Sequence, residues 1–204
     1  MTSILMNRDY TLILDKSGSM SASDQPNGQT RWQAVQESTL AVARKIEQLD
    51  PDGITVYTFA GRFKRYDNVT ADKVKQIFLE NDPMGTTNLT DVLKDTFQSY
   101  FQRKAAGEAQ EQGETVIVIT DGAPNDPAAV VRTIVDATQR MEKDEELAVT
   151  FFQIGNDSGA TEFLKALDDQ LQDVGAKFDI CDAVTFEDME NYSIMELLMK
   201  AIED

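Results

Sequence analysis

The chain has 204 residues, 41% of them hydrophobic, and a formal net charge of −17 at pH 7. This composition predicts one large domain over residues 1–204, with residues 1–8 as a short N-terminal tail, and it excludes a largely disordered chain. The acidic balance argues against a nucleic-acid partner, because phosphates would be repelled. The sequence has no run of 18 apolar residues, so we expect neither a membrane span nor a membrane partner.

Two residue types are scarce, and their scarcity narrows the chemistry. Histidine is absent, which removes Ser-His-Asp and Cys-His catalysis and the common histidine-containing zinc sites. Cys181 is the single cysteine, so the sequence offers no internal disulfide and no thiolate zinc site. A reducing compartment is favoured, and the apolar cluster before residue 10 is too small for a signal-peptide core, so we expect a cytoplasmic protein.

Strand-like and helix-like segments alternate along the chain, and this order predicts a three-layer α/β fold. In chain order we expect a strand over residues 10–14, a helix over 30–49, strands over 54–60 and 63–69, helices over 70–79 and 90–106, a strand over 115–120, a helix over 127–141, a strand over 147–154, a helix over 160–172, a strand over 178–183 and a helix over 186–202. Thr30 and Thr90 are the expected N-caps of their helices, and Trp32 is expected in the core. The charged segment 63–69 suits the edge of a six-stranded, mostly parallel sheet, antiparallel to its neighbour, with segment 10–14 near the centre.

An acid and two hydroxyls follow the first strand directly. Asp15, Ser17 and Ser19 come after the apolar run 10–14, and Gly18 lets the backbone turn between the two serines. Open α/β sheets place ligands just past the carboxyl ends of their strands, and hard oxygen donors suit Mg²⁺, Mn²⁺ or Ca²⁺. The same residues would also make an ordinary capping turn, so this stretch by itself leaves both interpretations open.

Two further stretches favour the metal interpretation. The strand over 115–120 also ends in an acid, Asp121, which is followed by Gly122. The loop over 81–91 is dense in oxygen donors and contains Gly85, Thr86 and Thr87. Three oxygen-rich loops are therefore expected at strand ends.

Together these residues resemble the signature of von Willebrand factor A (vWA) domains that carry a metal-ion-dependent adhesion site. That signature is Asp-x-Ser-x-Ser after the first strand, a threonine in a Gly-x-Thr loop, and Asp-Gly after the fourth strand. The order of strands and helices is similar over nearly the whole chain. The resemblance implies a Rossmann-like vWA fold with helices on both faces of the sheet, of a stand-alone intracellular type distantly like the tellurite-resistance vWA domains.

The resemblance also implies a role for each residue. Ser17, Ser19 and Thr87 would give hydroxyl oxygens to one divalent ion, with Mg²⁺ expected foremost and Ca²⁺ or Mn²⁺ as alternatives. Asp15 and Asp121 would act through bound water or by hydrogen-bonding the serines. Because the hydroxyls are neutral, the ion would keep positive charge and could accept an Asp or Glu side chain from a protein partner. Thr86 is the rival of Thr87, which the spacing from Gly85 favours.

Neighbouring polar residues and competing motifs have simpler interpretations. Asn88, Asp91 and Asp126 are close in sequence to these loops, but turn and cap chemistry is favoured for all three. An EF-hand would need glycine and glutamate where Met20 and Pro26 stand. The glycine patterns of dinucleotide and P-loop sites are absent from the sequence.

We therefore expect a non-enzymatic, metal-dependent protein-interaction module, of a kind found beside ATPase machines or in stress-response systems. A Ca²⁺- or Mg²⁺-responsive regulator whose conformation changes on ion binding is the alternative, since the loop with Asp24 and Asn27 could add ion sites. A metal-dependent phosphohydrolase is least favoured, because the site offers no base or nucleophile.

Overall fold

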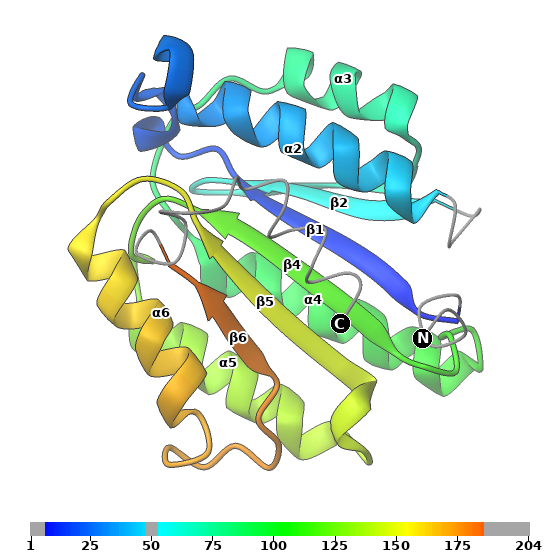
Figure 1. The fold of residues 1–204 in the computed structure, drawn as a ribbon. Helices are drawn as coiled ribbons and strands as arrows, with labels where there is room; N and C mark the ends of the chain where they lie inside the picture. The colour runs from blue at the N-terminus through cyan, green and yellow to red at the C-terminus, as the bar shows by residue number, and fades with distance from the viewer. Residues whose placement is uncertain (1–6, 48–52, 186–204) are drawn as a thin grey trace.

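The computed structural model of the protein describes residues 7–47 and 53–185, and residues 1–6, 48–52 and 186–204 lie outside this description. The described chain forms one sheet with helices on both faces (Figure 1). Its strands are β1 (Asp9–Asp15), β2 (Ile54–Phe59), β3 (Phe63–Val69), β4 (Glu114–Thr120), β5 (Leu147–Gln153) and β6 (Cys181–Val184). Its helices are α2 (Arg31–Ile46), α3 (Ala71–Glu80), α4 (Leu89–Ala106), α5 (Pro127–Arg140) and α6 (Ser158–Gln170), with short 3₁₀ turns η1 (Gly18–Ser21), η2 (Pro26–Gly28) and η3 (Asp144–Glu146).

The sheet has the strand order β3-β2-β1-β4-β5-β6. All neighbouring strands are parallel except β2 and β3, which are antiparallel. The expected six-stranded, mostly parallel sheet is confirmed, with segment 63–69 at one edge and segment 10–14 near the centre. From β1 the chain proceeds outward through β2 and β3, and from β4 it proceeds outward on the other side. The carboxyl ends of β1 and β4 therefore lie at a topological switch point, where open α/β sheets bind their ligands.

Two apolar clusters lie on opposite faces of the sheet and make the three layers. One packs α4, α5 and α6 against the sheet, and the other packs α2 and α3. β1 serves both clusters, since Ile13 belongs to the first and Leu14 to the second. Trp32 lies in the second cluster with its ring centroid 4.4 Å from that of Phe78, so the expected core position of Trp32 is confirmed.

Three of the differences between the expected and the observed element boundaries have a clear physical cause. Thr90 was the expected cap of the fourth helix, but Asn88 is the N-cap of α4, because Leu89 and Thr90 are both buried in its first turn. The last strand begins at Cys181 and not at residue 178, because pairing with β5 starts at Val149 opposite Cys181. α6 begins at Ser158, two residues early, because the Asp157 side chain caps it by accepting from the Ala160 amide. The helix expected over 186–202 lies outside the described residues.

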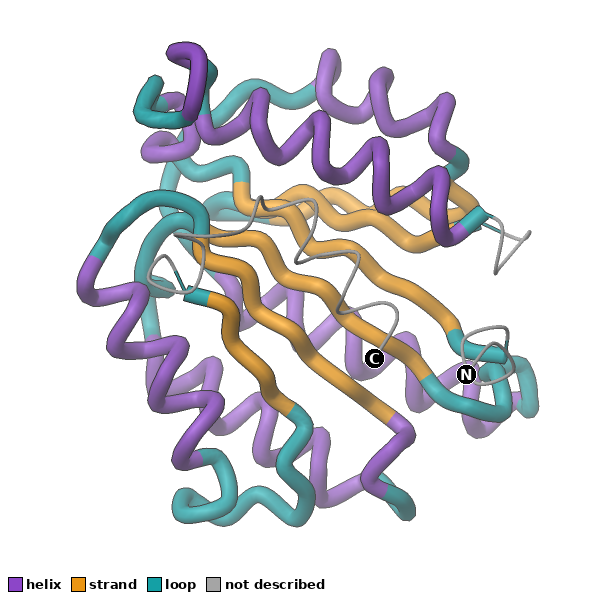
Figure 2. Tube along the Cα trace, in the orientation of Figure 1, coloured by secondary structure: helices purple, strands orange, loops and turns teal. Residues whose placement is uncertain are grey.

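The loops that follow β1, β4 and β5 gather at one end of the sheet (Figure 2). Backbone hydrogen bonds continue the pairing of neighbouring strands into these loops. The Lys16 amide donates to the Phe59 carbonyl at 2.8 Å, and the Ile154 amide donates to the Thr120 carbonyl at 2.9 Å. The parallel order thus brings residues 15–19 and 121–125, far apart in sequence, to the same place.

Candidate metal centre

Asp15 is the last residue of β1 and is fully buried beside the end of β4. Its Oδ1 accepts from the Ser17 amide at 2.7 Å, and its Oδ2 accepts from the Thr120 hydroxyl at 2.7 Å. Burial raises the pKa of the Asp15 carboxyl to about 6, against these two hydrogen bonds, which lower it. Asp15 therefore holds the turn of the first loop and adds a negative charge beneath it.

Ser17, Ser19 and Asp121 bring three oxygens into a small triangle. The two serine Oγ atoms are 3.1 Å apart, and the Ser19 hydroxyl donates to Asp121 Oδ1 at 2.8 Å. The Ser17 Oγ lies 3.5 Å from the same carboxylate oxygen. Asp121 is buried at the end of β4, whereas Ser19 is exposed in η1, so the triangle joins the interior to the surface.

Two edges of this triangle are close to the oxygen spacing around a small divalent cation. Octahedral Mg²⁺ with bonds of about 2.0–2.1 Å holds neighbouring oxygens about 2.9–3.0 Å apart, and the three edges here are 2.8, 3.1 and 3.5 Å. Within residues 7–47 and 53–185, no three His, Cys, Asp or Glu side chains are grouped to hold a metal. The oxygens at this place come from two serine hydroxyls and one carboxylate.

The loop with Thr87 packs against both of the other loops through its backbone. The Gly18 amide donates to the Gly85 carbonyl at 3.1 Å, and the Met84 amide donates to the Lys16 carbonyl at 2.7 Å. Gly85 has φ +86°, a left-handed conformation that glycine adopts without strain. Thr87 is half-buried, and its hydroxyl makes no hydrogen bond with the described residues. All five predicted site residues thus lie at strand ends or on loops that meet at one end of the sheet.

Asn125 is a site residue that the sequence interpretation missed. Its side chain accepts from the Thr87 amide at 3.2 Å and donates to the Thr86 hydroxyl at 3.2 Å. The Asn125 amide also donates to the Thr87 carbonyl at 2.9 Å. Asn125 therefore ties the threonine loop to the loop after β4 and occupies the Thr86 hydroxyl, which leaves Thr87 as the free donor of the pair.

Arg31 was also missed, and its guanidinium lies within the site. Its Nη1 donates to Asp121 Oδ2 at 2.9 Å, and its Nη2 donates to Asp24 Oδ2 at 2.5 Å. A signal was present in the sequence, because a cation in the first turn of a helix opposes the helix dipole and needs an acidic partner. The identity of that partner could not be read from a separation of 90 residues.

The three polar residues assigned to turns and caps behave as expected. Asn88 caps α4, with its side chain accepting from the Asp91 amide at 3.4 Å and donating to the Asp91 carboxylate at 2.7 Å. Asp126 caps α5 by accepting from the Ala129 amide at 2.9 Å. Both residues organise the helices that follow the site loops.

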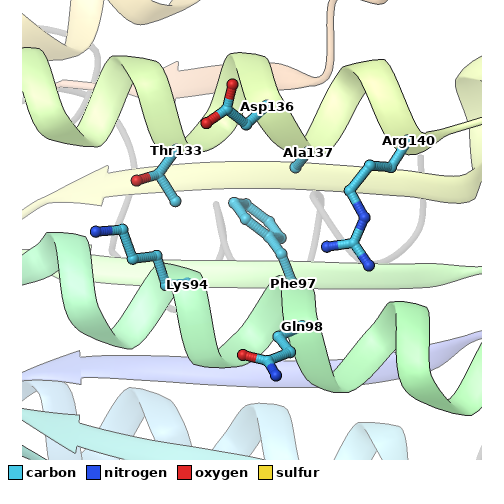
Figure 3. A pocket seen from close by; sticks show the side chains of 7 residues that line it. All are labelled: Lys94, Phe97, Gln98, Thr133, Asp136, Ala137 and Arg140. Carbon is cyan, nitrogen blue, oxygen red and sulfur yellow. The ribbon is translucent and has the colours of Figure 1, made fainter.

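A shallow pocket of about 120 Å³ lies elsewhere, between α4 and α5 (Figure 3). Lys94 and Arg140 stand at its two ends with Phe97 between them (Figure 3). Its full lining is Lys94, Phe97, Gln98, Thr133, Asp136, Ala137 and Arg140. None of the five predicted site residues lines it, so the candidate centre is the oxygen-rich sheet end and not this pocket.

An α/β domain with an oxygen-rich loop cluster at its switch point defines a class of ligand-binding domain. Residues 10–123, more than half of the chain, match the family model of the von Willebrand factor type A domain. The chain therefore belongs to the von Willebrand factor type A domain family, whose members typically mediate metal-dependent protein interactions. Comparison with the curated proteins finds no match for this sequence.

Solved structures with a similar fold include three proteins of low sequence identity. Manganese-loaded TRAP protein of Plasmodium vivax has a TM-score of 0.62 and 16% identity over 97% of this chain and 74% of its own. The D319A mutant of the PilB minor pilin from Streptococcus sanguinis has a TM-score of 0.62 and 13% identity over 98% of this chain and 60% of its own. The pilus adhesin SpaC from Lactobacillus rhamnosus GG has a TM-score of 0.59 and 13% identity, covering 96% of this chain and 30% of its own. The chain thus spans less than two thirds of the two pilus proteins, and these likenesses establish the fold. Among the described residues no helix is long and apolar enough to cross a membrane.

Proposed function

We propose that this chain binds one divalent cation at Ser17, Ser19 and Thr87, supported by Asp15 and Asp121, and that the ion captures an acidic side chain of a protein partner. The observation that carries the proposal is the triangle of Ser17, Ser19 and Asp121 oxygens with edges of 2.8–3.5 Å. Mg²⁺ is the expected ion, with Mn²⁺ and Ca²⁺ as alternatives, because all three prefer oxygen ligands. The manganese in the TRAP structure supports a divalent ion on this fold.

The donor set explains why a bound ion would seek another carboxylate. Hydroxyl oxygens carry no formal charge, so the two aspartates supply the negative charge of the site. A divalent ion held mainly by neutral oxygens keeps positive charge and acts as a Lewis acid toward an incoming anion. We propose adhesion and not hydrolysis, because both carboxylates beside the serines are already engaged, Asp121 by Arg31 and Asp15 by the Ser17 amide and the Thr120 hydroxyl.

Titration calorimetry with Mg²⁺, Mn²⁺ and Ca²⁺ tests the metal step. Asp121→Ala and the double variant Ser17→Ala/Ser19→Ala should each lose binding, because each removes part of the triangle. Both variants should keep the wild-type circular-dichroism spectrum. Asp136→Asn, an exposed change on α5, is the matched control and should bind as the wild type does. Unchanged metal affinity in Asp121→Ala would contradict the proposed ligand set.

Capture from lysate with and without chelator, followed by partner mutagenesis, tests the adhesion step. Binding of the captured partner should vanish in EDTA and should fall when one partner Asp or Glu becomes Asn or Gln. Thr87→Ala should weaken the complex more than it weakens metal retention, because two serines still hold the ion. A partner that binds equally well in excess chelator would show that another surface is used.

A further inference from the structure

The Arg31 side chain bridges two carboxylates that come from different loops. Besides its bonds to Asp121 Oδ2 and Asp24 Oδ2, its Nε donates to Asp24 Oδ1 at 3.1 Å. The side chain is only 11% exposed, and Asp24 on its outer side is 40% exposed. The guanidinium is therefore held in one orientation, by Asp24 on its Nε and Nη2 atoms and by Asp121 on its Nη1 atom.

Gly155 provides the space in which the guanidinium lies. A Cβ atom built on Gly155 would lie 2.4 Å from the Arg31 Cζ, so any side chain at this position would force the guanidinium to move. Gly155 also has φ +80° and follows Ile154, which is bonded to the end of β4. The end of β5 is thus shaped to admit Arg31 beside Asp121.

A buried cation at this position requires its acidic partners. Arg31 is the first residue of α2, where the positive end of the helix dipole opposes a cation. The Asp24 carboxylate raises the pKa of Arg31, and Arg31 lowers the pKa of Asp24. Both groups therefore carry their full charge at neutral pH.

We infer that Arg31 sets the charge of the proposed metal centre: it neutralises Asp121 through Oδ2, leaves Oδ1 facing the serines, and keeps a bound ion electrophilic toward the partner's carboxylate. This inference rests on the proposed function. Asp15 and Asp121 together bring two negative charges, which would cancel a divalent ion. Arg31 adds one positive charge beside them, so the ion, the two aspartates and Arg31 together carry a single net positive charge. Asp24 reduces this effect from the solvent side, where its charge is screened.

Loss of the Arg31 charge should raise the affinity for Mn²⁺ and lower the affinity of the loaded centre for acetate. In Arg31→Gln, Asp121 is released and the local charge falls by one, so Mn²⁺ should bind at least about tenfold more tightly, a change of about 1.4 kcal/mol. The Mn²⁺-loaded variant should bind acetate at least about threefold more weakly, because less positive charge remains. Electron paramagnetic resonance of free Mn²⁺ gives the first constant, and paramagnetic relaxation of the acetate methyl protons gives the second.

Two further variants, Arg140→Gln and Asp24→Asn, test the role of Arg31 even if Arg31→Gln does not fold. Arg140→Gln removes the same charge from an exposed position at the far end of α5 and should change both constants less than twofold. Asp24→Asn removes the outer carboxylate, so it should weaken Mn²⁺ binding and strengthen acetate binding, relative to the exposed control Asp136→Asn. Circular dichroism checks that each variant is folded.

The results distinguish a failure of the role proposed for Arg31 from a failure of the proposed metal and carboxylate binding. If the wild type binds neither Mn²⁺ nor chelator-sensitive acetate, the proposed function itself fails. If the wild type binds both, but Arg31→Gln matches Arg140→Gln or moves both affinities in the same direction, the role of Arg31 is overturned. Should Arg31→Gln not fold, an Asp24→Asn variant that behaves like Asp136→Asn overturns it equally.

Discussion

Asp15 and Asp121 both end core strands, but their surroundings differ. Asp121 has a cationic partner in Arg31, whereas Asp15 is compensated by hydrogen bonds from Ser17 and Thr120. This is the reason that burial raises the pKa of Asp15 to about 6. In the absence of metal, an ionised Asp15 therefore costs folding free energy, as strained groups at binding sites often do.

The first prediction is a pH dependence that runs opposite to ordinary acid denaturation. Because the folded pKa of Asp15 lies above the unfolded value of 3.8, the folded protein binds more protons between about pH 4 and 6. The Asp15 contribution to the unfolding free energy should thus fall as pH rises through this window, by up to about 3 kcal/mol. Urea unfolding in EDTA at pH 4.5 and 7.5, for wild type and Asp15→Asn, measures it. The variant should gain relative stability at pH 7.5, and an equal difference at both pH values would contradict the assignment.

At this scale the sequence reveals only those site residues whose signal is local. Asp15, Ser17 and Ser19 stand within five residues, and Asp121 ends a strong apolar run, so their pattern was readable. Asn125 and Arg31 act through contacts across 38 and 90 residues of sequence. Their hydrogen-bond partners depend on how the strands are ordered, which no short motif encodes.

Among the secondary-structure elements, two helices begin shortly after the site loops in the sequence. α4 and α5 begin within a few residues of Thr87 and Asp121, each with a side-chain cap. These caps satisfy backbone amides that would otherwise point unpaired toward the site. Capping and metal binding are therefore separable functions of neighbouring acidic and amide residues.

The second prediction separates those two functions at Asp126. Asp126→Ala removes the hydrogen bond to the Ala129 amide and should lower the unfolding free energy by about 1 kcal/mol. The Mn²⁺ affinity of the folded variant should stay within about threefold of wild type, because Asp126 is no part of the oxygen triangle. Denaturant unfolding and calorimetry give the two values. Loss of metal binding with unchanged stability would make Asp126 a ligand instead of a cap.

Boundaries were the weakest part of the sequence prediction, for a physical reason. Period and apolar content gave the kind and order of every described strand and helix, but the ends depend on pairing and caps. Cys181 starts β6 because it faces Val149, and Asn88 replaces Thr90 as a cap because Leu89 and Thr90 are both buried. These determinants are tertiary contacts, which local propensity does not contain.

For the whole molecule the dominant feature is its charge of −17. Such an excess destabilises the compact state through self-repulsion, and salt screens that repulsion. The third prediction is that the metal-free protein gains about 1 kcal/mol of unfolding free energy when NaCl rises from about 10 to about 150 mM, as the Debye length falls from about 30 to about 8 Å. Urea is the suitable denaturant because it is uncharged. A stability that falls with salt would show that ion pairs outweigh the net charge.

Cys181 has a practical consequence that follows from its place on β6. The residue is 4% exposed, burial raises the pKa of its thiol well above the ordinary value, and its strand pairs with β5 along one side. An alkylating reagent can therefore reach the sulfur only while this margin of the sheet is open. The mass of a single adduct, followed over time, would report the frequency of that opening. Because the chain has one cysteine, the alkylation rate of Cys181 measures local unfolding at this edge of the sheet. Comparing this rate with and without Mn²⁺ would show whether ion binding near the centre of the sheet stabilises β6 at its edge.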